Sequence, residues 1–170
     1  VAFAAPVRYL ERDDLLRSGT ATGCSVGTPT GAGAWWTDTV SGCGEGTLSM
    51  AVRPGAVADA VSNWGPARQA DAPTILIDRS GPVIGAPKVA LRSAEPLASI
   101  SAKTGVLATL AWSASDAGGA GLASFDVRRS RDGEPFTDLA LGVTQPTLDL
   151  WLAPGHAYRF SVRARDRAGN

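Results

Sequence analysis

The sequence has 170 residues, with 16 acidic and 16 basic side chains, so its formal net charge is zero. This balance argues against a nucleic-acid binder held by a strong general field, although a local basic face is still compatible with it. The 20 Gly and 11 Pro, with one Met and one His, favour turn-rich β structure. No stretch approaches the roughly 18 apolar residues of a membrane-spanning helix.

The first 20 residues match no clear template. The opening VAFAAPVRYLERDD has neither an initiator Met nor a charged region before its short apolar run. We therefore expect an internal fragment whose export signal, if there is one, lies upstream. Leu10, Leu15 and Leu16 have helix-like spacing, but a strand distorted by a long loop fits equally well, and both interpretations stay open.

Cys24 and Cys43 are the two cysteines, and each lies beside a glycine. A bridge between them would close a loop of about 20 residues, worth roughly 3 kcal/mol in the chain-entropy model. Such a bridge suits an oxidising compartment. Two reduced core thiols are the alternative, whereas two cysteines without a nearby His cannot fill a tetrahedral zinc shell. We expect the disulfide.

Two segments share an Asp-x-x-x-Asn pattern, Asp59 to Asn63 and Asp166 to Asn170. Each follows a stretch that reads as a turn and an alternating strand, EGTLSMAV in the first case and PGHAYRFSV in the second. We interpret the two segments as corresponding parts of a repeat, with coincidence as the alternative. Each Asp is expected to accept hydrogen bonds from the backbone amides of its own turn.

After the first copy, the chain continues through a loop to a short β-branched strand at 74–78 and a Ser-Gly-Pro turn. This pattern predicts a first domain at 1–79, of which residues 1–20 are the least defined part. Residues 80–87 are predicted to be a short stiff linker, because Pro and Gly recur there. The second domain is expected at 88–170.

Six strands are expected in this second domain, at 88–91, 106–112, 122–131, 134–139, 147–152 and from Tyr158 onward. The Asp132-Gly133 pair is typical of a tight hairpin turn. Six strands in about 85 residues predict an antiparallel sandwich. The whole chain is therefore expected to be all-β, with two tandem antiparallel β-sandwiches.

The segment LAPGHAYRFSVRARDRAGN, with Trp112 on the second strand, resembles the fibronectin type III pattern over residues 83–170. In that family a Tyr at the start of strand F forms a tyrosine corner, bonding to upstream backbone. The resemblance implies structural roles for Trp112, Leu152 and Tyr158. We also expect the second unit to lack its last strand, because the first unit continues after DAVSN through a loop to the strand at 74–78, whereas the sequence ends directly after RARDRAGN.

The first unit differs from that pattern, because Leu48 or Ser49 stands where the corner Tyr would be. The pattern EG…DAVSN followed by ILIDRSGP instead resembles bacterial immunoglobulin-like repeats over about residues 20–79. The resemblance implies a bacterial source and structural roles for the residues of both turns, Asp59, Asn63, Asp166 and Asn170.

No residue pattern selects a catalytic or metal site. His156, the single imidazole, lies in a turn and is read as a loop residue without a nucleophile. Asp13, Asp14 and Asp149 have no spacing that favours acid–base chemistry. The Asp residues at strand ends lack the D-x-D-x-D-G pattern of a calcium loop. We expect no enzyme activity, no cofactor and no bound metal.

Two surface features are candidates for ligand binding. If strands C and F pair, Arg128, Arg159, Arg163 and Arg165 share one sheet face, which would suit an anionic polymer such as an acidic polysaccharide or a cell-wall phosphate polymer. A solvated face that blunts edge association is the alternative. Four tryptophans are candidates for stacking on sugar rings or for packing, and Trp36 is taken as part of the candidate surface: Trp35, Trp36, Trp64 and Trp151.

The function expected from these patterns is that of a non-catalytic spacer or adhesion module in a larger secreted or cell-surface bacterial protein. Its partners would be neighbouring domains of the same polypeptide, without nucleic acid and without a membrane span. The alternatives are a module that binds carbohydrate or an anionic cell-wall polymer, and an accessory domain of an extracellular hydrolase.

Overall fold

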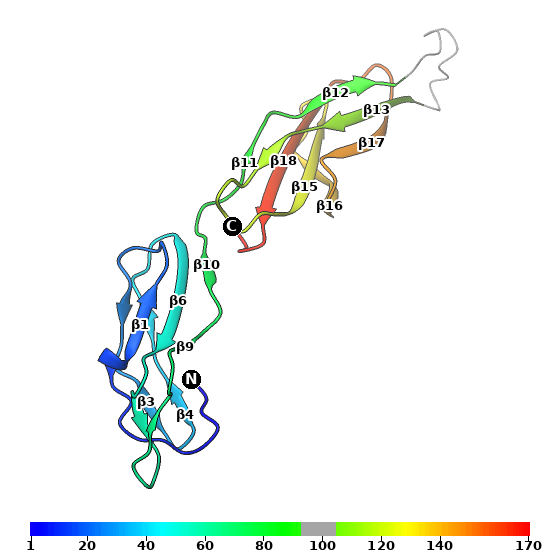
Figure 1. Cartoon of the computed structure of the whole chain (residues 1–170). Coiled ribbons are helices and arrows are strands. Elements are labelled where there is room, and N and C mark those ends of the chain that lie inside the picture. Colours follow the sequence, from blue (N-terminus) through cyan, green and yellow to red (C-terminus); the bar gives the residue numbers. More distant parts are fainter. Residues whose placement is uncertain (93–104) are drawn as a thin grey trace. The chain divides into compact units, whose positions relative to one another are not determined.

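The computed structural model describes residues 1–92 and 105–170, so part of the expected second domain, residues 93–104, lies outside the described residues. The fold class is confirmed, because the described chain is built from antiparallel strands and contains one short 3-10 helix, η1 (Arg12–Asp14). The chain forms two compact units, Val1–Asp78 and Arg79–Asn170 (Figure 1). No helix in the described ranges is long and apolar enough to cross a membrane.

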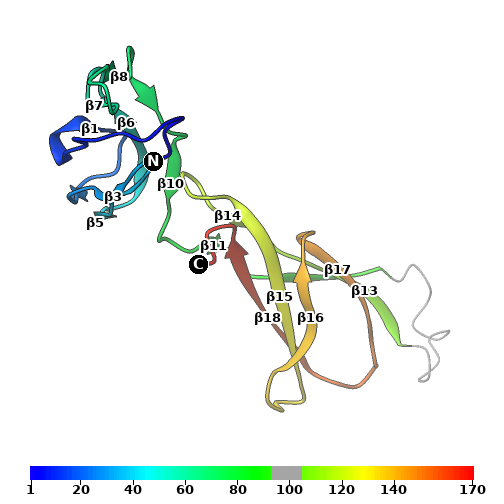
Figure 2. The same cartoon turned by 90° about the horizontal axis from the view of Figure 1, so that it is seen from below.

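The second unit contains two three-stranded sheets. One has the order β12-β13-β17 and the other β16-β15-β18, and Figure 2 shows β15 and β18 as long neighbouring strands. The bounds are β12 (Lys88–Leu91), β13 (Val106–Ala111), β15 (Leu122–Arg131), β16 (Thr137–Val143), β17 (Thr147–Leu152) and β18 (Tyr158–Asp166).

One apolar core joins these two sheets. Leu110 from β13 and Val127 from β15 are fully buried in it, and Trp112 packs edge-on against Phe125 with ring centroids 5.4 Å apart. Because strand side chains alternate, Phe125 and Val127 point inward while Arg128 points to the outer face. The core therefore fixes which side chains the outer face of β16-β15-β18 presents.

The Asp132-Gly133 turn joins β15 to β16. Both residues have positive φ, 53° and 85°, and Glu134 N–H donates to Arg131 C=O at 2.9 Å. This is the pair of left-handed residues that a tight hairpin requires. The following strand was predicted at 134–139 but begins at Thr137, because the hairpin leaves three residues unpaired after the turn.

The linker prediction for 80–87 is wrong in part. β11 (Val83–Ile84) pairs with β14 (Ala114–Ser115), and Gly85 N–H donates to Ser113 C=O at 2.8 Å. These bonds make residues 83–85 of the segment part of a short strand pair in the second unit. The β-branched Val83-Ile84 pair outweighs the flanking Pro and Gly residues that indicated a linker.

β18 is an edge strand in the described part of the chain. Its residues pair with β15 along their full length, from Tyr158 opposite Arg131 to Asp166 opposite Leu122. The sheet order places β18 at the end of β16-β15-β18.

The first unit is organised around one longer strand, β6 (Gly46–Val52). β1 (Leu15–Ser18), β9 (Ala70–Asp71) and β10 (Ile75–Ile77) pair with it. The strand interpretation of residues 1–20 is correct for Leu15 and Leu16, which lie in β1, whereas the helix suggested by the leucine spacing does not form, because η1 spans only Arg12–Asp14. Three short pairs complete the unit: β2 (Ser25–Val26) with β5 (Val40–Ser41), β3 (Thr30–Ala32) with β4 (Trp35–Thr37), and β7 (Val57–Ala58) with β8 (Trp64–Gly65).

The apolar core of the first unit is smaller than that of the second. Leu10, Val52, Ala56 and Val57 form its buried part. A disulfide joins Cys24 and Cys43, which are 19 positions apart, and it ties β2 and β5 into the same unit. Small cores are commonly supplemented by such covalent links.

The two Asp-x-x-x-Asn turns differ in what precedes them. β18 runs directly into Asp166, but β6 ends at Val52, and a turn and the two-residue β7 intervene before Asp59. The expectation that an alternating strand leads directly into each turn is therefore wrong for the first copy. Pro54 and Gly55 interrupt the extended run there.

Candidate functional site

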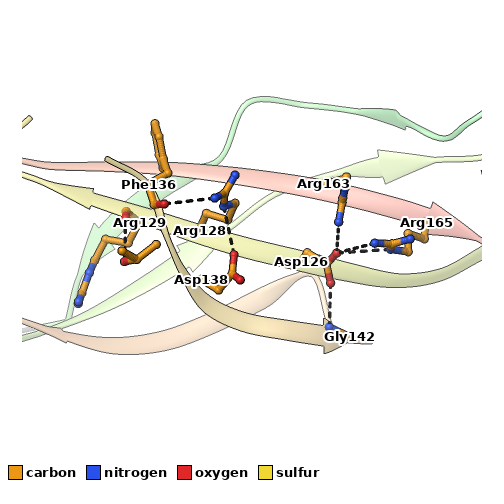
Figure 3. A network of polar contacts seen from close by, with 9 residues as sticks. Asp126, Arg128, Arg129, Phe136, Asp138, Gly142, Arg163 and Arg165 are labelled. Atoms are coloured by element: carbon orange, nitrogen blue, oxygen red, sulfur yellow. Dashed lines mark hydrogen bonds and ion pairs between the residues drawn. The ribbon is translucent and has the colours of Figure 1, made fainter. Parts of the chain in front are cut away.

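The arginine face is the outer surface of β15 and β18 that carries Arg128, Arg159, Arg163 and Arg165. The strand register places Asp126 opposite Arg163 and Arg128 opposite Ser161. Alternation then brings Arg159, Arg163 and Arg165 to the same side of β18. Figure 3 shows Arg163 and Arg165 converging on the carboxylate of Asp126.

Asp126 is the acceptor that the arginine side chains Arg163 and Arg165 of this face share. It points outward like Arg128, yet only 8% of its surface is exposed because other groups cover it. Its Oδ2 accepts from Arg163 Nη2 at 2.7 Å and from Arg165 Nη2 at 3.3 Å, and its Oδ1 accepts from Gly142 N–H at 3.1 Å. One carboxylate thus joins β15, β16 and β18.

These contacts lower the pKa of the Asp126 carboxyl. The Arg163 hydrogen bond contributes most, followed by the Gly142 amide, and together with Arg165 they outweigh the opposing effect of burial. Hydrogen bonds and positive charges near a carboxylate favour its ionised form. Asp126 is therefore held as an anion, which is the form that binds two guanidinium groups.

A second ion pair lies beside this cluster. Arg128 Nε and Asp138 Oδ1 are 3.1 Å apart, and Arg128 Nη2 donates to Phe136 C=O at 3.2 Å. Together with the Asp126 cluster they line a groove of about 550 Å³, whose walls are formed by Asp126, Arg128, Asp138, Leu141, Ser161, Arg163 and Arg165.

The positive charge of the predicted basic surface is therefore largely neutralised by aspartates. Within the groove, three arginines face two aspartates, so a single positive charge is in excess. The neighbouring Arg159 has no ion pair among those recorded for the described residues. The prediction did not include Asp126 or Asp138 as counter-charges. The face is therefore not a bare cationic strip.

Trp36, the tryptophan assigned to the candidate ligand surface, is less exposed than its neighbour Trp35. It is half-buried and packs against the core of the first unit, with Nε1–H donating to Gly33 C=O at 3.3 Å. Its neighbour Trp35 points the other way and is 74% exposed. This is the alternation expected of adjacent residues on a strand. Trp64 and Trp151 are each 62% exposed.

The two Asp-x-x-x-Asn turns have the same hydrogen bonds. Asp59 Oδ1 accepts from Asn63 N–H at 2.9 Å and its Oδ2 accepts from Asn63 Nδ2 at 2.8 Å. Asp166 and Asn170 make the same two bonds at 2.8 and 2.9 Å. The pKa of Asp59 is lowered chiefly by the Asn63 side chain. At Asp166 burial is the largest single effect and raises the pKa, but the hydrogen bonds from Asn170 and the turn amides together outweigh it, so the pKa is lowered.

The corner residue Tyr158 is bonded to backbone five positions upstream. Its hydroxyl accepts from Ala153 N–H at 3.0 Å and donates to Ala153 C=O at 3.4 Å. Leu152, directly before Ala153, is buried in the core. These contacts fix the chain reversal between β17 and β18 and leave Tyr158 no free hydroxyl for chemistry.

His156 has carboxylate and guanidinium neighbours. Its Nδ1 lies 2.6 Å from Asp132 Oδ2, and its Nε2 contacts Arg131. Asp132 also accepts from Ala157 N–H at 2.9 Å. Among the hydrogen bonds recorded for residues 1–92 and 105–170, none links His156 to a hydroxyl or thiol, so the nucleophile–base pair of a hydrolase is not formed there.

Asp116 and Asp166 bring two carboxylates within 4.8 Å of each other in the second unit. Asp116 Oδ2 accepts from Gly121 N–H at 2.6 Å, and Asp166 binds Asn170. Each therefore acts as an acceptor for its own turn.

Asp126, Asp138 and Tyr9 were missed by the sequence analysis. An acidic residue between two inward apolar residues, opposite an arginine on the paired strand, is a signal that points to Asp126. Tyr9, in contrast, lies in a segment without periodicity, and its position depends on contacts with residues far along the chain.

The fold and these sites define a two-unit, all-β protein with antiparallel sheets and a disulfide. No protein-family model matches the chain, and no solved structure matches it. Two curated relatives from Cellulomonas fimi are similar to part of it. Endoglucanase B is 46% identical over 76 residues, and exoglucanase B is 40% identical over 77 residues. In both cases the match covers 44% of this chain and 7% of the relative.

Proposed function

We propose that this chain is a non-catalytic accessory part of an extracellular bacterial glucanase, with an immunoglobulin-like first unit and a fibronectin type III-like second unit that act as a spacer. The observation that carries the proposal is the similarity to two C. fimi enzymes that differ in type, an endoglucanase and an exoglucanase. Matches of 76 and 77 residues that fill only 7% of each relative are better explained by a non-catalytic module than by the source of either activity.

The chemistry of the described residues supports a non-catalytic role. His156 is engaged by Asp132 and Arg131, and Asp126 is engaged by Arg163 and Arg165. A glycosidase needs two carboxyl groups that flank a bond to be cleaved, one of them protonated. The carboxyl of Asp126 has a lowered pKa, so it is unsuited to act as the acid.

The architecture supports a spacer. Each unit has its own apolar core, so each is held in shape without an added ligand. The Cys24–Cys43 disulfide is of the kind that persists outside the reducing cytosol.

The accessory role is tested by joining the chain to the catalytic domain of a glucanase. The control is the same catalytic domain with a Gly/Ser linker of equal length. We expect equal hydrolysis of a soluble glucan and faster hydrolysis of insoluble cellulose when the chain is present. Equal rates on insoluble cellulose would contradict the accessory role, and hydrolysis by the chain alone would contradict its non-catalytic character.

A second candidate function is binding of an anionic polysaccharide at the arginine face. The excess positive charge in the groove favours it, and guanidinium groups bind carboxylates and phosphates with paired hydrogen bonds. Retention of the chain on an acidic polysaccharide should fall as salt is raised. Retention that is unchanged at high salt, or that survives the double change Arg163→Ser and Arg165→Ser, would contradict this candidate.

A further inference from the structure

Two exposed aromatic side chains stand together on the first unit, and we call them the aromatic pair. Tyr9 and Trp64 are 57% and 62% exposed, and their ring centroids are 5.8 Å apart with the planes inclined by 22°. Neither residue is a member of the core cluster of this unit. Two large apolar rings that avoid the core and lie side by side on the surface are a feature of binding surfaces.

The backbone on both sides of the aromatic pair is fixed by hydrogen bonds. Arg8, next to Tyr9, exchanges two backbone bonds with Ala58, at 2.8 and 3.1 Å. Ala58 in turn is the strand partner of Trp64 in the β7–β8 pair. The register of these two short pairings brings Tyr9 and Trp64 together although they are far apart in sequence.

Arg8 and the Asp59–Asn63 turn are bonded to each other beside the aromatic pair. The Arg8 guanidinium donates to the carbonyls of Asp59 and Ala60, at 3.1 and 2.8 Å, and it also lies over the Tyr9 ring, 5.9 Å from the centroid. The Asp59 carboxylate accepts from Val61 N–H and from Asn63. The charged groups beside the aromatic pair are thus committed to the turn, which leaves an apolar surface with its neighbouring charges satisfied.

Tyr9 adopts an unfavourable backbone conformation to take this position. Its φ is 73°, in the left-handed region that a bulky side chain rarely occupies. Such strain is found where the surrounding structure enforces it, often at binding sites. Here the strain places a ring in solvent rather than in the core, so it serves no packing purpose within the unit.

We infer that the aromatic pair is a platform for the sugar rings of a neutral glucan. The apolar C–H faces of a pyranose ring fit against aromatic faces, and a surface whose nearby charges are already satisfied suits an uncharged ligand better than an anion. A rigid pair loses little side-chain entropy on binding. The choice of a glucan rests on the proposed function, whereas the location of the site rests on the geometry of Tyr9 and Trp64.

The structure supplies matched controls. Trp35 and Trp151 are exposed to a similar or greater degree, 74% and 62%, but neither has a ring partner among those recorded for the described residues. If exposure alone were enough for glucan binding, these residues would contribute as much as Trp64. If a preorganised pair is required, only Tyr9 and Trp64 matter.

The experiment measures the affinity of the full chain for cellohexaose by titration and its retention on insoluble cellulose. Trp64→Ala and Tyr9→Gly should each weaken binding by roughly five- to tenfold, which is the scale of aromatic stacking. Glycine accepts the positive φ of Tyr9, so Tyr9→Gly removes the ring while relieving strain and keeps the variant folded. Trp35→Ala and Trp151→Ala should bind as the parent does, and added salt should have little effect.

Three results would overturn the inference: no binding of either glucan by the parent chain, unchanged binding in the folded Tyr9→Gly variant, or binding that falls steeply with salt. Its failure can be told apart from failure of the proposed function. A chain that accelerates hydrolysis of insoluble cellulose in the fusion, yet binds equally well after Tyr9→Gly, retains its accessory role and loses the platform. A chain that binds through the aromatic pair but gives no acceleration in the fusion keeps the platform and loses the accessory role.

Discussion

Asp126 shows at the scale of one residue how a surface position becomes a structural one. Its side chain is on the outer face of a sheet, where an aspartate would ordinarily be solvated. Two arginines from the neighbouring strand cover it, and the Gly142 amide approaches from the other side. A single carboxylate thereby contributes to the pairing of three strands.

Replacing Asp126 with Asn should destabilise the second unit by about 1–3 kcal/mol, since hydrogen bonds to charged groups contribute that much. The amide keeps the acceptor for Gly142 but loses the charge that binds Arg163 and Arg165. Urea unfolding measures the change. Asp138→Asn is the control, because its pair with Arg128 is exposed and should contribute less than about 1 kcal/mol. Equal losses in the two variants would contradict the role of Asp126.

The chain should lose stability in acid through four carboxyl groups. The pKa values of Asp59, Asp126, Asp132 and Asp166 are all lowered from the ordinary 3.8. A group of this kind binds its proton more readily in the unfolded chain. Its stabilising contribution is therefore present above 3.8 and is lost as the pH falls through the folded pKa. Unfolding in urea at neutral pH and at about pH 3 should show the loss.

The acid loss in Asp126→Asn should be smaller than in the parent, because one of the four groups no longer titrates. A variant whose stability falls with acid as steeply as that of the parent would show that Asp126 does not contribute to the effect.

Tyr158→Phe tests the corner at the start of β18. The change removes the hydroxyl that bonds to both backbone groups of Ala153 and leaves a partly buried N–H without its acceptor. We expect a loss of about 1 kcal/mol in the free energy of unfolding of the second unit. Tyr9→Phe is the matched control and should leave stability unchanged, since no hydrogen bond of the Tyr9 hydroxyl is recorded within the described residues. A loss of the same size in both variants would contradict the prediction.

At the scale of elements, the hairpin between β15 and β16 depends on its two left-handed residues. Gly133 has a φ of 85°, and nothing lies within 4 Å of the position that a Cβ would take. Gly133→Ala should therefore cost about 1 kcal/mol through backbone strain alone. Gly133→Asn should cost less, because Asn tolerates this conformation. Thermal unfolding compares the two, and a larger loss for Asn would contradict a purely conformational cause.

Strands with strict alternation could be predicted from the sequence, and their positions follow from periodicity. β17 has the predicted bounds and β18 begins at the predicted Tyr158, because apolar residues at every second position select one buried face. β12 also has the predicted bounds, although all four of its residues are exposed. β7 and β8 could not be predicted in this way, since two-residue strands have no period. Their existence depends on contacts with Arg8 and on the Asp59–Asn63 turn.

The candidate site was predictable only in part, because some of its contacts depend on how strands pair and not on the pattern within one strand. The alternation of β18 correctly places Arg163 and Arg165 on one face, but the covering of Asp126 depends on the register between strands, which a single strand does not reveal. Trp35 and Trp36 are a second case in which alternation within one strand is not enough. Alternation implies that one of them is exposed, and only the β3–β4 pairing decides that it is Trp35.

At the scale of the whole molecule, the two units should differ in what stabilises them. The second relies on a core that spans two sheets, whereas the first combines a small core with a disulfide. The double change Cys24→Ser and Cys43→Ser should lower the free energy of unfolding of Val1–Asp78 by about 3 kcal/mol, as the chain-entropy model gives for this loop. Calorimetry should show the loss in one transition only. Equal shifts of both transitions would show that the units do not unfold independently.

The closed loop between Cys24 and Cys43 also determines how the chain responds to a protease. β2 and β5 are paired at its base, and the disulfide joins the same two segments covalently. A protease that cuts once within the loop, for instance near the exposed Trp35, would leave both pieces attached to each other. The nicked chain should migrate as one species on a denaturing gel and separate into two pieces only after reduction, so that one cleavage need not release either part.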